Sequence, residues 1–176
     1  MKRVAVISTA SGSGKTTVAS ALAERLEVPY YELDALHHGP NWAEPPLEEF
    51  RARVKAIVRS ESWVIDGAYR GKLGDLVLEH AELVVWLDLP LRVWLPRLAR
   101  RTARRVIRRE ELWAGNRETL RDALHPHNSV VLYALRQHRG QRRAYASELS
   151  RFPVLRLRTP TEVDDFLESA RQQSAK

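Results

Sequence analysis

Short, nearly continuous runs of apolar residues recur along the chain, and longer stretches with helical spacing separate them. Such runs are typical of parallel strands that are buried on both faces. Between the first two runs, Val18, Leu22 and Leu26 recur every four residues, which predicts a helix with one buried side. Five strands are expected, at Val4 to Ile7, Val28 to Leu33, Trp63 to Ile65, Leu83 to Leu87 and Val154 to Leu157.

Further helices are predicted between and after these strands. Phe50, Val54 and Ile57 keep helical spacing after a Pro-Pro pair, which suits a helix start. A long helix is expected from Leu91, another over about Ser129 to Leu149, and a last one after the capping box at 159 to 162. Alternating strands and helices predict a doubly wound α/β sheet with ligands at the carboxyl ends of its strands.

The composition is that of a soluble globular chain: 176 residues, 44% hydrophobic and 29% charged, without internal repeats or low-complexity tracts. One domain is expected at this length. Asp88 and Arg92 interrupt the most apolar later stretch before it reaches membrane-spanning length, so no membrane partner is expected. The chain has no cysteine, which excludes disulfides and thiolate metal sites and fits a cytoplasmic location.

The net charge of +7 is concentrated in one segment. Residues 91 to 121 contain ten arginines and three glutamates, a difference of seven, so the rest of the chain is close to neutral. A segment with this charge favours an anionic partner. Nucleic acid, a lipid surface and the phosphates of small substrates all satisfy that requirement.

The sequence STASGSGKTT at residues 8 to 17 follows the first predicted strand and opens a helix. A strand, a glycine-rich turn and Lys-Thr at a helix start form a phosphate-binding loop, although Thr9 stands where its first glycine is usual. That glycine eases the turn and supplies no charge, so the cradle is expected to persist. The nucleotide-binding residues are predicted to be Ser11, Gly12, Ser13, Gly14, Lys15, Thr16 and Thr17.

Two later stretches resemble adenylate kinases. WVIDGAYR at 63 to 70 is similar to their DGxxR stretch, which implies that Asp66 orients a metal-bound water and Arg70 holds an anionic group of the acceptor. LDLPLRVWLPRLARR at 87 to 101 is similar to the strand and helix that lead into their lid. This likeness implies that Arg97 and Arg101, on one helical face, bind the triphosphate.

Taken over the chain, these motifs resemble adenylate-kinase-like P-loop kinases, and most nearly the related DNA topology modulation proteins. The resemblance implies a three-layer α/β/α sandwich around a five-stranded parallel sheet in the order 2-3-1-4-5. It also implies one domain with an acceptor-side insertion at about 35 to 62 and a short arginine-rich lid at about 102 to 121. Arg117, Arg121 and Arg136 are further lid candidates.

The acceptor side is less defined. Asp34 follows the second predicted strand and either deprotonates a hydroxyl or binds the acceptor in another way, while Trp42 is a candidate for stacking on a ring. Arg70 favours an acceptor that bears an anion. His37 and His38 lack companions with metal-ligand spacing, so a transition-metal site is not expected.

Together these features predict an ATP-dependent phosphotransferase that uses Mg²⁺ and moves the γ-phosphate to a small-molecule or nucleotide acceptor. The catalytic residues would be Lys15, Arg97, Arg101 and Asp34, with Thr16 and Asp66 at the metal. The alternative is a nucleic-acid-binding protein in which nucleotide binding is regulatory, suggested by the basic segment. A protein of that kind would have no need for Asp34 and the DGxxR stretch beside a phosphate loop.

Overall fold

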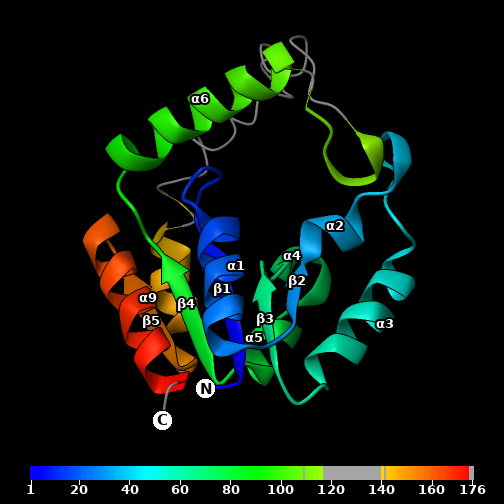
Figure 1. The fold of residues 1–176 in the computed structure, drawn as a ribbon. Helices are drawn as coiled ribbons and strands as arrows, with labels where there is room; N and C mark the ends of the chain where they lie inside the picture. The colour runs from blue at the N-terminus through cyan, green and yellow to red at the C-terminus, as the bar shows by residue number, and fades with distance from the viewer. Residues whose placement is uncertain (109, 117–139, 141, 175–176) are drawn as a thin grey trace.

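The computed structural model describes residues 1–108, 110–116, 140 and 142–174 (Figure 1). Five strands form one parallel sheet in the order β2-β3-β1-β4-β5, which confirms the expected topology. The register aligns Val6 with Asp66 and Ser8 with Leu87, so the carboxyl ends of neighbouring strands lie along one edge. The strands are β1 Arg3–Ser8, β2 Tyr30–Glu32, β3 Trp63–Asp66, β4 Leu83–Leu87 and β5 Val154–Leu157.

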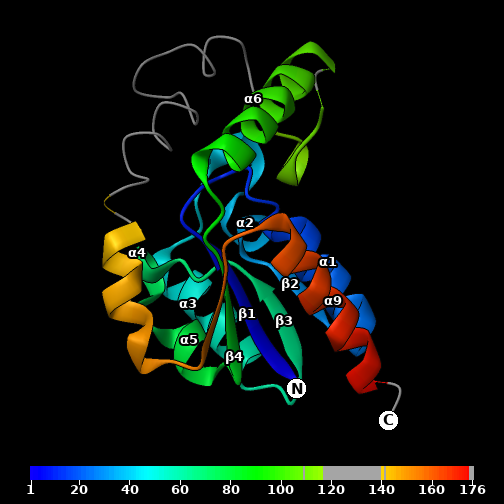
Figure 2. The ribbon, with the colours of Figure 1, turned by 90° about the vertical axis from the view of Figure 1, so that its left-hand side faces the viewer.

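Helices cover both faces of the sheet. Figure 2 shows α1 and α9 on one face, and α3, α4 and α5 with the helical residues 142–148 on the other. This is the expected three-layer α/β/α sandwich. The α-helices are α1 Lys15–Leu26, α2 Leu33–His37, α3 Leu47–Val58, α4 Arg70–Leu73, α5 Leu76–His80, α6 Leu91–Arg108 and α9 Pro160–Ser174; the 3-10 helices are η1 Pro40–Trp42, η2 Trp113–Gly115 and η3 Leu149–Arg151.

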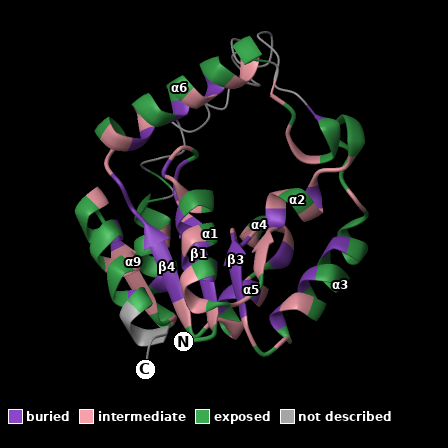
Figure 3. Ribbon diagram, viewed as in Figure 1, coloured by how far each residue is buried: buried purple, intermediate pink, exposed green. Residues whose placement is uncertain are grey.

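Two hydrophobic cores flank the sheet. Ala5 and Ile7 of β1 point into the core beneath α3 and α5, whereas Val4 and Val6 point into the core beneath α1 and α9. Both sets are buried, and in Figure 3 the central strands are purple along most of their length. The near-continuous apolar character of the strand sequences therefore reflects burial on both faces.

Helix α6 lies apart from these layers, across the carboxyl edge of the sheet (Figure 1). Its buried residues Trp94 and Leu98 pack on Ala10, which belongs to the loop after β1. The rest of the helix is largely exposed, as the green segments in Figure 3 indicate. The basic helix is thus anchored by a small apolar contact directly above the candidate phosphate loop.

The predicted bounds of the second strand differ most from the structure. Strand β2 ends at Glu32 and Leu33 begins helix α2, so the strand expected over Val28 to Leu33 is shorter at both ends. Helix α9 begins as predicted, because Thr159 Oγ1 accepts a hydrogen bond from the Glu162 amide at 3.1 Å. Of the helix expected over Ser129 to Leu149, residues 140 and 142–148 are helical and the remainder before them lies outside the described residues.

No helix in the described part of the chain is both long and apolar enough to cross a membrane.

Candidate active site

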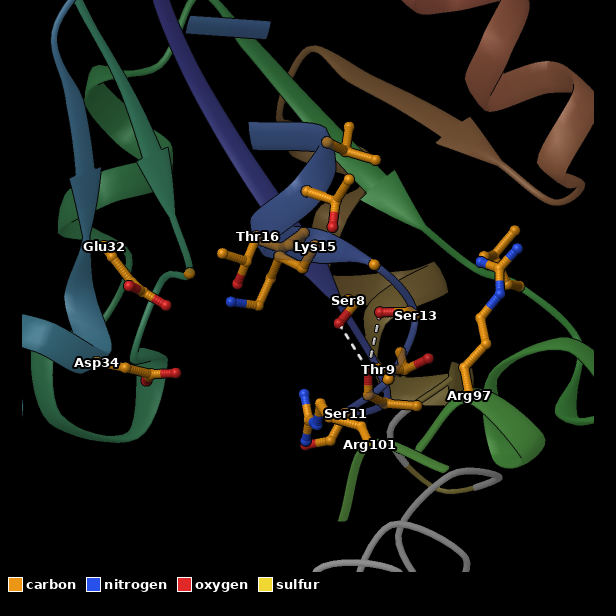
Figure 4. A pocket seen from close by; sticks show the side chains of 18 of the residues that line it. Ser8, Thr9, Ser11, Ser13, Lys15, Thr16, Glu32, Asp34, Arg97 and Arg101 are labelled. Carbon is orange, nitrogen blue, oxygen red and sulfur yellow. Dashed lines mark hydrogen bonds between the residues drawn. The ribbon is translucent and has the colours of Figure 1, made fainter. Parts of the chain in front are cut away.

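The loop between β1 and α1 has the backbone of a phosphate cradle. Gly12 and Gly14 have φ angles of 84° and 87°, in the left-handed region that favours glycine. Ser13 Oγ donates a hydrogen bond to the Ala10 carbonyl at 2.8 Å, and Ser8 Oγ donates to the same oxygen at 3.0 Å (Figure 4). These bonds hold the turn in shape and leave the start of α1 facing the open space, where backbone N–H groups favour an anion.

Thr9, which replaces the usual first glycine, does not carry a left-handed φ angle. Its side chain is buried, with 4% of the residue exposed. A β-branched residue adopts this backbone conformation without strain, so the position has no requirement for glycine here. The loop keeps its shape with threonine at its first position.

Lys15, Thr16 and Asp66 meet at the start of α1. Thr16 Oγ1 donates to Asp66 Oδ2 at 2.6 Å, and Lys15 Nζ forms an ion pair with Asp66 Oδ1. Only 1% of Asp66 is exposed, because β3 places it beside β1 at the sheet edge. The Tyr30 hydroxyl lies 3.3 Å from Asp66 Oδ2, and burial together with the charges of Asp66 and Glu32 raises its pKa. Tyr30 therefore stays protonated and donates to this carboxylate.

The donor set at this point fits a magnesium ion. A hydroxyl and a carboxylate oxygen lie within hydrogen-bond distance of each other at the phosphate end of the loop. Magnesium prefers oxygen ligands and retains several waters, which one carboxylate and one hydroxyl allow. Thr16 and Asp66 are the residues of this chain that would hold it.

Arginines of α6 face the same space as the loop. Arg97 and Arg101 line an open cavity of about 1330 Å³ together with the loop residues 8 to 17. A Cβ on Gly14 would lie 4.0 Å from Arg97 Nη1, so this guanidinium reaches the phosphate end of α1. Arg104 and Arg105 line the cavity as well. The helix therefore presents several cations toward the position that the loop favours for an anion.

The opposite side of the cavity is formed by β2, α2 and the segment that follows. Figure 4 shows Glu32 and Asp34 across the loop from Arg97. Asp34 Oδ1 accepts a hydrogen bond from the Tyr69 hydroxyl at 2.5 Å, and burial and the Asp34 charge raise the pKa of Tyr69. Tyr69 keeps its proton and fixes the orientation of this carboxylate. Trp42 lines the cavity too and is 40% exposed.

Comparisons with known proteins agree with this architecture. No family model matches the chain, and no curated protein matches it in sequence. Among solved structures, a gluconokinase from Sinorhizobium meliloti 1021 is similar with a TM-score of 0.55 and 19% identity, covering 99% of this chain and 91% of that one. A shikimate kinase from Acinetobacter baumannii is similar with a TM-score of 0.54 and 16% identity, covering 98% and 92%. A deoxyadenosine kinase from M. mycoides is similar with a TM-score of 0.51 and 10% identity, covering 97% of this chain and 99% of that one.

The chain has the P-loop kinase fold. The loop at residues 8 to 17 occupies the place of the P-loop in that fold, between the central strand and the first helix. The identities are low, so the likeness extends to the fold and not to a particular activity. The finer resemblance to DNA topology modulation proteins stays a prediction.

Arg70 lies outside the group of residues that meet at the P-loop. Its guanidinium forms ion pairs with Asp75 and Glu148, and it is not among the residues that line the cavity. Burial lowers the pKa of Arg70, but the hydrogen bonds to Asp75 and Glu148 raise it by more, so the pKa is raised overall. In the P-loop kinase fold of this chain, Arg70 joins α4 to the helical segment before η3, and its predicted contact with an acceptor anion gains no support.

The lid arginines Arg117, Arg121 and Arg136 lie outside the described residues, so their roles stay predictions. Residues 102–108 of the predicted lid continue α6, and residues 110–116 return toward the acceptor side of the P-loop kinase fold. The insertion expected at about 35 to 62 contains η1 and α3. That these residues form an insertion on the acceptor side, and that residues 102 to 121 form a lid, both stay predictions.

The two adjacent histidines have different surroundings. His37 is buried, its Nε2 lies 2.6 Å from Lys72 Nζ, and Lys72 also pairs with Glu44. Burial and the Lys72 charge lower the pKa of His37. His38 instead lines the cavity. Within the described ranges of the chain, no group of three or more His, Asp or Glu residues has the placement of a metal site.

Sequence reasoning missed two residues that line the cavity opposite the P-loop. Glu32 Oε2 accepts a hydrogen bond from Trp113 Nε1 at 3.0 Å, and both residues line the cavity. Glu32 ends the edge strand β2, and polar residues at strand ends of an α/β sheet are a signal for ligand contact. Trp113 gave no such signal, because the basic segment around it suggested an anionic partner instead.

Proposed function

We propose that the protein is an ATP-dependent phosphotransferase that moves the γ-phosphate of Mg-ATP to a hydroxyl group of a small acceptor. The observation that carries the proposal is the meeting of Lys15, Thr16 and Asp66 at the P-loop, with a carboxylate across the same cavity. The first three residues suit a nucleotide triphosphate and its metal. The carboxylate, Asp34, suits an acceptor hydroxyl.

The donor side would bind the triphosphate by its backbone and its cations. P-loop N–H groups and Lys15 bind phosphate oxygens, and Arg97 and Arg101 stabilise the charge that spreads over the transferred group. When bound, magnesium supplies charge neutralisation on the β- and γ-phosphates. Phosphoryl transfer depends mainly on positioning and electrostatics, and this set of residues provides both.

On the acceptor side, Asp34 would orient the attacking hydroxyl and take its proton. The acceptor oxygen forms a bond to the γ-phosphorus while the bond from that phosphorus to the β–γ bridging oxygen breaks, and ADP departs with the electron pair of that bond. The acceptor proton passes to Asp34 Oδ2 and then to solvent. Tyr69 holds Asp34 Oδ1, which leaves Oδ2 for the acceptor.

The nucleic-acid-binding alternative has less support. Four arginines of α6 line the P-loop cavity, where they face a nucleotide site, and two carboxylates line the other side. The phosphates of a nucleic acid backbone would be repelled by those carboxylates, which disfavours binding there. Magnesium, ATP and a cytoplasmic location remain parts of the proposal for the enzyme.

The test is ADP release with a panel of acceptors, measured for the wild type and for Lys15→Ala. Turnover by the wild type and its loss in the variant would support the kinase. Lys55→Ala, an exposed lysine on α3, is the matched control and should keep full activity. No turnover with any acceptor, together with DNA affinity that survives Lys15→Ala and falls steeply with salt, would contradict the proposal.

A further inference from the structure

Charge divides the cavity into two halves. The P-loop and α6 contribute only cationic side chains among its ionisable residues: Lys15, Arg97, Arg101, Arg104 and Arg105. The opposite wall, here called the acceptor wall, includes two carboxylates and three rings: Glu32, Asp34, His38, Trp42 and Trp113. Asp164 of α9 also lines the cavity, outside this wall. The two halves therefore suit ligands of different charge.

The rings of the acceptor wall form a continuous group. The His38 ring lies 5.4 Å from that of Trp42 and 5.7 Å from that of Trp113, measured between centroids. Trp113 is tied to Glu32 by its indole N–H at 3.0 Å. The wall thus offers flat apolar faces next to hydrogen-bond acceptors, and the carboxylates of Glu32 and Asp34 point toward the P-loop side of the cavity (Figure 4).

Asn116 fixes this wall in place. Its side chain accepts from the Trp42 amide at 2.9 Å and donates to the Gly39 carbonyl at 2.8 Å, and the residue is 5% exposed. Trp42 and Ala114 both have left-handed φ angles, 59° and 55°, which are unfavourable for residues other than glycine. Contacts that hold two such conformations together are frequent at binding sites.

The described residues of the acceptor wall offer neither a lysine nor an arginine to an anionic ligand. Arg70, which sequence similarity suggests for that task, is engaged by Asp75 and Glu148. Of the described residues on this wall, Glu32 and Asp34 would face a phosphate or carboxylate on the acceptor, and repulsion between like charges selects against anionic ligands.

We infer that the acceptor is a nucleoside without a phosphate group, whose base lies against Trp42 and Trp113 and whose sugar hydroxyl faces Asp34. This inference rests on the proposed function and names its substrate class. Bases stack on aromatic side chains, and their ring or exocyclic N–H groups donate to carboxylates such as Glu32. The transfer is the one written above, with the sugar oxygen as the attacking atom and Asp34 as the proton acceptor.

The experiment compares kcat/KM for three classes of acceptor in the ADP-release assay. Nucleosides should exceed their own 5′-monophosphates and the hydroxy acids shikimate and gluconate by at least about tenfold, because two carboxylates face the acceptor. Uncharged sugars without a base should turn over more slowly than nucleosides. Preference for a monophosphate, a hydroxy acid or a plain sugar would overturn the inference while leaving the kinase intact.

Failure of the inference and failure of the kinase proposal give different results. ATP titration followed by fluorescence, with and without Lys15→Ala, reports on the donor half alone. Lys15-dependent ATP binding with turnover of another acceptor refutes only the nucleoside. ATP binding that is absent or indifferent to Lys15 refutes the kinase, and the nucleoside with it.

Two variants test the wall itself. Glu32→Gln should lower the nucleoside-to-monophosphate ratio of kcat/KM by about tenfold, because one repulsive charge is removed. Loss of structure alone would lower both values together and leave the ratio unchanged. Glu61→Gln, an exposed residue before β3, is the matched control. Asn116→Ala should raise KM for the nucleoside and leave KM for ATP unchanged. Equal effects on both KM values would contradict the proposal that the acceptor wall binds the nucleoside.

Discussion

Substitution of Gly12 by alanine tests how closely the P-loop and α6 are packed. A Cβ at this position would lie 2.8 Å from Leu98 Cβ and 2.9 Å from the Trp94 carbonyl oxygen. Gly12 also has a φ of +84°, which an alanine adopts only with strain. Both effects arise where the small contact with Ala10 anchors α6 to the loop.

The expected loss of stability is the sum of two terms. An L-residue in the left-handed region costs about 1–2 kcal/mol. Forcing a methyl group into a packed contact costs about 1–3 kcal/mol more, since Leu98 contributes backbone as well as side chain. The total, about 2–5 kcal/mol, is a large part of the roughly 5–15 kcal/mol that stabilises a domain.

Urea unfolding measures this difference. With a slope of about 2 kcal/mol per molar, Gly12→Ala should lower the unfolding midpoint by about 1–2.5 M. Gly115→Ala is the matched control, because Gly115 has a φ of +77° and no atom within 4 Å of the added Cβ. It should show only the backbone cost of about 1–2 kcal/mol. Equal losses in the two variants would refute the close contact between α6 and the P-loop.

Three further outcomes are expected. Asp88→Asn should lower the free energy of unfolding by about 1–3 kcal/mol in thermal or urea denaturation, because the buried carboxylate loses two arginine partners that themselves remain partly exposed. Thr9→Gly should leave ATP affinity unchanged by titration and lower stability by at least about 0.5–1 kcal/mol, because glycine gains entropy in the unfolded chain. Burial and the charge of Lys72 lower the pKa of His37, so near that pKa the unfolded chain binds a proton at His37 more strongly than the folded chain does. The free energy of unfolding should therefore fall as the pH drops below about 6.5. His37→Gln should reduce that slope in pH-dependent denaturation, whereas His80→Gln should keep it.

The strands and helices followed from local patterns and the strand order from the resemblance to P-loop kinases, and the structure confirms both. Strands such as Leu83–Leu87 are buried on both faces, and this burial leaves a continuous apolar run in the sequence. Boundaries were less accurate at β2, where the apolar Leu33 follows Glu32 and was assigned to the strand, but begins α2 and is buried in the core. Hydrophobicity reports that such a residue is buried, and it does not report in which element.

The P-loop residues and the arginines that line the cavity with them could be predicted from motifs and resemblance, because these residues are close in sequence or obey helical spacing. Gly12, Gly14 and Lys15 belong to one turn, and Arg97 and Arg101 are four residues apart on one helix. The partners of Arg70 could not be found in this way. Glu148 is 78 residues distant, so only the fold reveals that the two form an ion pair.

The acceptor wall extends the same reasoning to specificity. The Trp113–Glu32 bond joins residues 81 positions apart, and Asn116 reaches Trp42 across 74 positions. Neither pair has a motif, so a reading by resemblance transfers the acceptor contact to Arg70 and predicts an anionic acceptor. In the fold, Arg70 pairs with Asp75 and Glu148, and the described acidic residues of the acceptor wall are Glu32 and Asp34. The proposed phosphate chemistry therefore rests on a local motif, whereas the proposed choice of acceptor depends on contacts between residues that are far apart in the sequence.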